Sequence, residues 1–119
     1  MATLKLWTPE RKEIIWIDFD PSAGHEMKSE HPMLVLSTKP FNQKQGMVIG
    51  LAMTSKDYNE TNPFAVKLQV GDKVGYILAE RIQTLDWQAR RARQHEWKVC
   101  PDDVFDEACD KLNAIIQIG

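Results

Sequence analysis

The segment Glu13–Ser37, EIIWIDFDPSAGHEMKSEHPMLVLS, decides the fold of this 119-residue chain. Its first part, Glu13–Phe19, mixes β-branched and aromatic residues and ends at an Asp-Pro turn signal, which predicts a β-strand. The polar residues Ser22–His31 then indicate a loop, and the apolar run Met33–Leu36 predicts a second strand. The segment therefore begins a β-rich fold in which a long, charged loop separates two strands.

Short strands are predicted along most of the remaining chain. Met47–Met53 is apolar at nearly every position, which is typical of a strand that is buried on both faces. Phe64–Leu68 has the period-two pattern of a half-buried strand. A Gly-Asp turn precedes another strand at Val74–Leu78, and Ala92–Val99 is expected to be the last strand.

Two segments between these strands are predicted to be connectors. Lys39–Gly46 contains proline, asparagine and glycine, and Thr54–Asn62 is polar and ends before a proline. The stretch Ala79–Ala92 is less regular, and its residues TLDWQARRAR are compatible with a short helical turn.

The C-terminal residues have a clear helical pattern. Pro101 suits the first position of a helix, and Asp102 and Asp103 complement the positive end of the helix dipole. Apolar residues follow at helical spacing, at Val104, Phe105, Ala108, Leu112, Ile115 and Ile116. Six or so short strands and one terminal helix predict a mainly β (α+β) fold, either a small, partly open β-barrel or a strongly bent sheet. The length predicts a single domain, residues 1–119.

The composition is that of an ordinary globular protein, with 43% hydrophobic and 27% charged residues. No apolar run approaches the roughly 20 residues that a membrane span requires, and the first residues lack the pattern of a secretory signal. The formal net charge is −2, but residues 101–119 hold five acidic residues and one lysine, a net of −4, which leaves +2 for residues 1–100. Cys100 and Cys109 form neither a metal motif nor a disulfide framework. We therefore expect a cytoplasmic protein whose body leaves room for an anion-binding face.

The loop before Met33 concentrates groups that can transfer protons. It contains His25, Glu26, Lys28, Glu30 and His31. Two interpretations remain open: a solvated loop, where charged residues are common, or half of an active site in which imidazole and carboxylate groups exchange protons and a lysine neutralises phosphate. A zinc site is disfavoured because the spacing is not helical and a third ligand is missing. We expect no metal and no cofactor.

Two other groups of residues are candidates for binding an anion. Thr54, Ser55 and Lys56 follow a predicted buried strand, and the hydroxyls either cap a turn or donate to an anionic oxygen. The other group consists of arginines interleaved with tryptophans, Trp87, Arg90, Arg91, Arg93 and Trp97. Cations and flat rings suit a single-stranded nucleic acid, although tryptophans also serve in cores and arginines on solvated faces.

In their order along the chain, these residues resemble a known family. The segments EIIWIDFDPSAGHEMKSEHPMLVLSTKPFN, AMTSK, PFAVKL, GYILAERIQTLDWQARRA and PDDVFDEACDKLNAII are similar to the MazF/PemK (Kid) toxins of bacterial type II toxin–antitoxin modules. The resemblance runs from Glu10 to Ile116. It implies an SH3-like barrel of the CcdB/MazF type with a C-terminal helix, forming a homodimer. It further implies a metal-independent endoribonuclease that cuts single-stranded mRNA at a short sequence, is silenced by a cognate antitoxin, and binds operator DNA when complexed with it.

The resemblance also implies roles for particular residues. The catalytic positions of the family correspond to His25, Glu26 and Thr54, and a main catalytic arginine of the family is replaced here by His31. In the later strand, where the family often has Ala-Asp-Gln, this chain has alanine followed by glutamate and arginine. The expected RNA-binding residues are Lys28, Ser55, Lys56, Glu80, Arg81, Arg90 and Arg91.

The histidine at position 31 leaves three functional interpretations open. If His31 acts as acid or base while Lys28 or Arg81 supplies positive charge, the chain is an active ribonuclease. If the loss of the permanent bidentate cation prevents cleavage, the chain is a catalytically impaired member that still binds RNA or an antitoxin. A gyrase poison of the CcdB type shares the fold, but the polar loop and Thr54 favour RNA chemistry.

Overall fold

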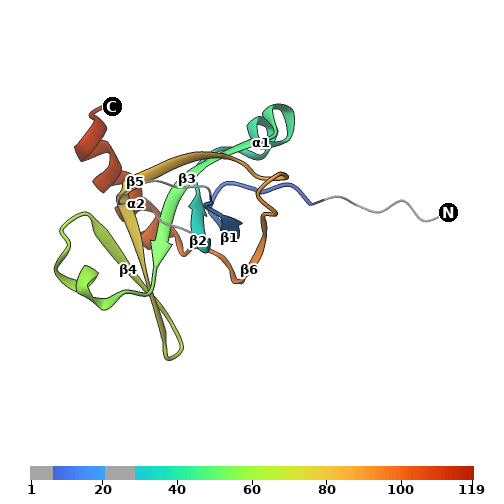
Figure 1. The fold of residues 1–119 in the computed structure, drawn as a ribbon. Coiled ribbons are helices and arrows are strands. Elements are labelled where there is room, and N and C mark those ends of the chain that lie inside the picture. The colour runs from blue at the N-terminus through green and yellow to red at the C-terminus, as the bar shows by residue number, and fades with distance from the viewer. Residues whose placement is uncertain (1–6, 21–28) are drawn as a thin grey trace.

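The computed structural model describes residues 7–20 and 29–119 and shows one curled antiparallel sheet with a C-terminal helix (Figure 1). Its strands are β1 (Glu13–Asp18), β2 (Glu30–Val35), β3 (Met47–Thr54), β4 (Ala65–Val70), β5 (Lys73–Asp86) and β6 (Arg93–Val99). The helical elements are α1 (Lys39–Gln45), the 3-10 helix η1 (Asp57–Thr61) and α2 (Asp102–Ile116). The strand order in the sheet is β4-β5-β3-β2-β1-β6. This mainly β half-barrel with a terminal helix confirms the predicted fold class.

The curl of the sheet originates in β3 and β5. β5 pairs with β4 over Lys73–Leu78 and with β3 over Tyr76–Asp86, and the register with β3 shifts between Leu51 and Met53. A shift of this kind bends a strand and increases its twist. The sheet therefore wraps around β3, and the first residues of β5 approach the edge strand β6 although three strands separate them in the sheet.

Alternate residues of the central strands fill two hydrophobic cores. One core lies against α2 and includes Ile14, Leu34, Leu51, Phe105, Ala108 and Leu112. The other lies on the opposite face of β1 and β2 and includes Ile15, Ile17, Met33, Val35 and Trp87. The central strands are thus buried on both faces, as the apolar run of β3 predicted. In the part of the chain that the structure describes, no helix is long and apolar enough to cross a membrane.

The prediction of a connector at Lys39–Gly46 was wrong, because this segment forms α1. Proline occupies the first turn of the helix, and Gly46 ends it in the left-handed conformation, with φ +67°. Proline at the start of a helix and glycine just past its end are boundary signals of a short helix. In this segment the same residues had indicated a loop.

Asn42 ties α1 into the molecule from a fully buried position. Its side-chain amide donates to the carbonyl oxygen of Pro9 at 2.8 Å. Its backbone carbonyl accepts a hydrogen bond from Nε1 of Trp87, also at 2.8 Å. Trp87 is therefore a core residue, which decides between the two interpretations that the sequence left open for it.

The second difference concerns β5, which is much longer than the predicted strand Val74–Leu78. It continues to Asp86, so the first residues of TLDWQARRAR belong to the strand, and residues 87–91 form turns. There the backbone N–H of Arg90 donates to the carbonyl oxygen of Asp86 at 3.0 Å, the bond of one short helical turn. Pairing of Tyr76–Asp86 with β3 explains the extension, because cross-strand partners outweigh weak local preferences.

Gly50 in β3 is predicted to be essential for stability. A Cβ atom at this position would overlap the carbonyl oxygen of Leu34 and lie 2.7 Å from Cγ of Met33. We expect Gly50→Ala to lower the free energy of unfolding by about 2–3 kcal/mol, as overpacking of a core does, measured by urea denaturation. Gly46→Ala is the control: the space around it is open and only the left-handed backbone is strained, which costs about 1 kcal/mol. Equal losses in the two variants would contradict this packing.

Candidate active site

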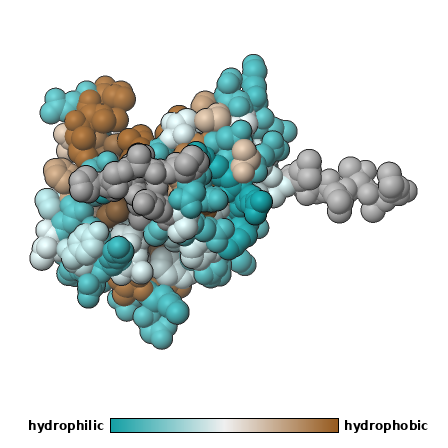
Figure 2. Space-filling model, in the orientation of Figure 1, coloured by the Kyte–Doolittle hydropathy of each residue, from teal (hydrophilic) through white to brown (hydrophobic). Residues whose placement is uncertain are grey.

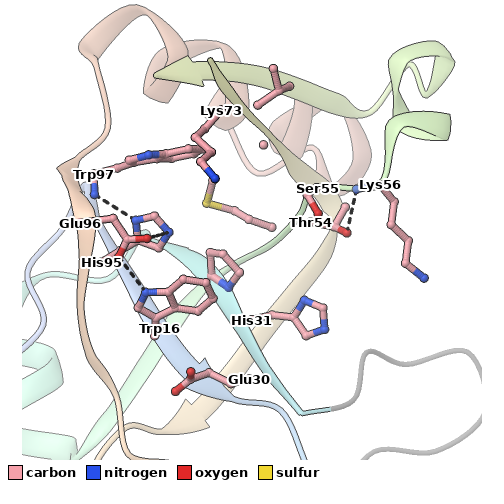
Figure 3. Close-up of a pocket in the computed structure, with 14 residues that line it drawn as sticks. Trp16, Glu30, His31, Thr54, Ser55, Lys56, Lys73, His95, Glu96 and Trp97 are labelled. Carbon is pink, nitrogen blue, oxygen red and sulfur yellow. Dashed lines mark hydrogen bonds and ion pairs between the residues drawn. The ribbon is translucent and has the colours of Figure 1, made fainter. Parts of the chain in front are cut away.

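A pocket of about 430 Å³ opens where the curled sheet brings β5 and β6 together (Figure 3). Its wall consists of Trp16 from β1, residues 30–32 of β2, residues 53–56 at the end of β3, residues 73–75 of β5 and residues 95–97 of β6. Figure 3 shows His31 and the end of β3 on one side, and the aromatic residues of β1 and β6 on the other. The two sides differ in chemistry and are described in turn.

His31 and Thr54 lie on neighbouring strands at this pocket. The last pair between β2 and β3 is Met33 with Ala52; His31 and Thr54 each lie two residues beyond that pair, and both line the pocket. The half-buried ring of His31 meets the ring of Phe19 edge-on, with 6.0 Å between centroids. Strand pairing and ring packing together fix the place of the imidazole.

Thr54 is held by the loop that follows it. The side chain is only 5% exposed, and Oγ1 accepts a hydrogen bond from the backbone N–H of Lys56 at 3.3 Å. Across the sheet, Thr54 pairs with Tyr76, whose hydroxyl donates to Glu60 in η1 at 2.6 Å. This hydrogen bond lowers the pKa of Glu60 and raises the pKa of Tyr76 to about 12. η1 is thereby anchored to the strand partner of Thr54.

The aromatic side of the pocket is built around His95, which is 5% exposed. Its ring stacks on Trp16, with 4.7 Å between centroids and 25° between planes, and is tilted against Trp97 at 5.0 Å. Nδ1 of His95 accepts the backbone N–H of Trp97 at 3.0 Å. Burial lowers the pKa of His95, so the imidazole favours the neutral form with its proton on Nε2.

Charged residues surround this aromatic group. Oε2 of Glu96 accepts a hydrogen bond from Nε1 of Trp16 at 3.2 Å. Arg93 pairs with Glu30 at 2.6 Å, and its guanidinium lies 5.3 Å from the centre of the Trp16 ring. Two exposed lysines also line the pocket, Lys73 beside Trp97 and Lys56 beside Thr54 and Ser55 (Figure 3).

Some of the residues predicted from the sequence lie together in this pocket. His31, Thr54, Ser55 and Lys56 all line it. The predicted residues His25, Glu26 and Lys28 fall outside the residues that the structure describes.

The other predicted RNA-binding residues do not line the pocket. Glu80 accepts a hydrogen bond from the side-chain amide of Asn62 at 3.1 Å, and Arg81 lies in the same strand, β5. Arg90 donates to the backbone carbonyls of Asp18 and Asp20, and Arg91 is exposed in the turn after β5. Their roles in RNA binding stay predictions.

The sequence reasoning missed several pocket residues, namely Trp16, Lys73, His95 and Glu96. The sequence held a signal for His95 and Glu96, because both lie in the polar and aromatic run Gln-His-Glu-Trp of the predicted last strand. Trp16 was hidden in an apolar strand, and Lys73 in a turn. Only the curl of the sheet places these four residues in one pocket.

The pocket combines the groups that chemistry at a phosphodiester needs. An imidazole can transfer a proton, a threonine hydroxyl can donate to a phosphoryl oxygen, and lysines can neutralise charge. Indole rings on the other side suit an unstacked base. Within residues 7–20 and 29–119, no cluster of three or more His, Cys, Asp or Glu side chains is placed to hold a metal ion.

Comparison with known proteins agrees with this architecture. Residues 10–116 match the family model of the PemK-like, MazF-like toxin of type II toxin–antitoxin systems. The chain is 34% identical over 100 residues to the endoribonuclease toxin MazF of Escherichia coli K12, covering 82% of this chain and 86% of that protein. The crystal structure of MazF from Deinococcus radiodurans superposes with a TM-score of 0.85 at 33% identity, covering 94% and 99% of the two chains. A MazE–MazF structure from the same organism gives a TM-score of 0.79 at 28% identity, covering 95% and 99%. The chain therefore belongs to the PemK-like, MazF-like toxin family of type II toxin–antitoxin systems.

Proposed function

We propose that this chain, acting as one domain, is an endoribonuclease toxin that cuts single-stranded mRNA at a short sequence in the cytoplasm. The cleavage is a metal-independent transesterification by the ribose 2′-hydroxyl, and a cognate antitoxin neutralises the enzyme. The observation that carries the proposal is the convergence of His31, Thr54 and two lysines on one pocket in a chain of this family. Membership of the family and the name of the Escherichia coli relative support the activity.

The reaction requires two proton transfers: one from the 2′-hydroxyl to a base, and one from an acid to the leaving 5′-oxygen. A base removes the proton of the 2′-hydroxyl, the 2′-oxygen attacks phosphorus, and the bond from phosphorus to the 5′-oxygen breaks. An acid then protonates the 5′-oxygen, so the products are a 2′,3′-cyclic phosphate and a 5′-hydroxyl. His31 serves as one of these two groups. His25 and Glu26 remain the candidates for the other.

Stabilisation of the phosphoryl oxygens falls to Thr54 and the lysines. Because Oγ1 of Thr54 accepts a hydrogen bond from the Lys56 N–H, the hydroxyl proton can be donated to a phosphoryl oxygen. Lys56 and Lys73 line the same pocket and supply positive charge that the replaced arginine would otherwise bring. Lysine acts there as a point charge, without the bidentate geometry of arginine.

Two protein partners belong to the proposal. The first is an antitoxin, supported by the MazE–MazF structure from Deinococcus radiodurans, and the resulting complex is expected to bind operator DNA. The second is another copy of this chain. Exposed isoleucines gather over the free end of α2 and beyond it, where Figure 2 shows a hydrophobic patch, at Ile115, Ile116 and Ile118. Patches of this kind mark interaction sites, and we assign this one to the homodimer.

His31 is predicted to be essential for cleavage. Incubated with a long single-stranded RNA in EDTA, the wild-type protein should cut at a short recurrent sequence and leave cyclic phosphate ends. His31→Ala should lower the rate by about 100-fold or more, the usual contribution of a general acid or base. The thermal unfolding of the variant should match that of the wild type.

The same assay separates the alternative functions. If the wild type is inert and His31→Arg cuts, the chain is an impaired member of the family that only binds. If neither protein cuts RNA, the ribonuclease proposal is wrong. Full activity of His31→Ala would remove His31 from the mechanism.

The cations are expected to differ in the salt dependence of RNA binding. Lys56→Ala should reduce the slope of log affinity against log salt by about 0.7, the value for one phosphate of a single strand. Arg91→Ala should do the same if Arg91 contacts phosphate, and an unchanged slope would make it a solvated residue. Lys44→Ala, which removes an exposed lysine at the end of α1, is the control.

The homodimer assignment predicts that Ile116→Lys yields a monomer in sedimentation experiments. Ile116 is 44% exposed, and a charge there would have to be buried against the second copy. Val70→Lys is the matched control, because Val70 is 42% exposed but lies beside the turn between β4 and β5. A dimer that persists in Ile116→Lys would place the interface elsewhere.

A further inference from the structure

The side chains on the aromatic side of the pocket are packed against one another and against the sheet. Trp97 packs directly on Gly75: a Cβ atom on Gly75 would lie 3.1 Å from the Trp97 ring. His95 is held between Trp97 and Trp16. Both indoles are half-buried, so each has surface left at the pocket. This leaves an ordered apolar surface beside the residues proposed to react.

One carboxylate, that of Glu96, is held at the rim of this surface. Oε2 accepts the N–H of Trp16 at 3.2 Å, and Oε1 lies 3.6 Å from Nε2 of His95. A backbone hydrogen bond of Glu96 itself and the bond from Trp16 lower the pKa of the carboxyl. Glu96 is therefore ionised at neutral pH, and its side chain remains 69% exposed and able to accept further hydrogen bonds.

The negative charge of Glu96 determines which part of an RNA can bind on the aromatic side of the pocket. It repels phosphate, which carries the same charge, and it accepts hydrogen bonds from the N–H groups of a base edge. Uracil presents its one donor between two carbonyl oxygens, and the amino groups of adenine and cytosine lie next to a ring nitrogen that is an acceptor. Guanine alone presents two adjacent donors, the ring N1–H and the 2-amino group, which match the two oxygens of a carboxylate.

We propose that Glu96 is a specificity-determining residue that binds the Watson–Crick edge of a guanine in the RNA. Trp16 and His95 are positioning residues that orient its carboxylate, and the half-buried indoles contact the base. His31 and Thr54 line the other side of the same pocket, so the guanine belongs to a nucleotide next to the cut phosphate. The inference rests on the proposed ribonuclease function and adds the base that this enzyme recognises.

Cleavage of RNAs with a randomised segment tests the assignment. The wild type should require guanine at one fixed position beside the cut. Inosine at that position lacks the 2-amino group and should lower the wild-type rate about tenfold, within the range for loss of part of a bidentate contact. In Glu96→Gln the guanine-to-inosine ratio should fall close to one. Glu107→Gln, which changes an exposed carboxylate on α2, should keep the wild-type ratio.

Binding of uncleavable 2′-O-methyl oligonucleotides separates this inference from the proposed function. If the wild type cuts no RNA, the proposed function fails, but preferential binding of guanine over inosine that Glu96→Gln abolishes would still support the site. Three results would overturn the inference. They are a cut sequence without guanine beside the cut, an unchanged ratio in Glu96→Gln, and equal binding of guanine and inosine oligonucleotides by the wild type. If Glu96→Gln keeps the preference for guanine over inosine but no longer binds a basic peptide that the wild type binds, the carboxylate belongs to a site for a protein partner instead.

Discussion

The contact between Trp97 and Gly75 is the interaction on which the pocket depends. It joins β6, at one edge of the sheet, to the start of β5, from which three strands separate it in the sheet. The contact is possible because β3 and β5 shift register near Leu51 and bend the sheet. Glycine at position 75 allows this close approach, because a Cβ atom there would lie 3.1 Å from the indole and crowd it. The curl that closes the half-barrel therefore also forms the pocket wall.

In the proposed mechanism, reaction and base recognition take place on two different sides of the pocket. His31 and Thr54 come from the adjacent strands β2 and β3, and their imidazole and hydroxyl are the groups that we propose for the reaction. His95 and Glu96 come from the edge strand β6 on the other side of the pocket. We propose that Lys56 and Lys73, which line the pocket, supply the positive charge that a permanent cation at position 31 would bring; Arg81 does not line the pocket, and Lys28 lies outside the described residues.

Much of the fold follows from local sequence pattern, and the failures have physical causes. The apolar run of β3 and the helical spacing of α2 predicted both elements, because burial imposes their periodicity. The helix α1 was missed because its proline and glycine, which mark its two ends, also occur in turns. The length of β5 was missed because pairing with β3, a distant segment, sets it.

The candidate site could be predicted only in part for the same reason. His31 and Thr54 stood out as polar residues beside apolar strands, and both line the pocket, from the neighbouring strands β2 and β3. Trp16 and Glu96, eighty residues apart, meet only through the pairing of β1 with β6. Nothing in the local sequence around either residue encodes that contact.

The most direct test of this account is a crystal structure of the protein with an RNA that contains its cut sequence and a 2′-deoxyribose at the reacting nucleotide. The scissile phosphate is expected between His31 and Thr54, with the Watson–Crick edge of a guanine on Glu96. A phosphate bound away from both residues would contradict the assignment of this pocket as the active site.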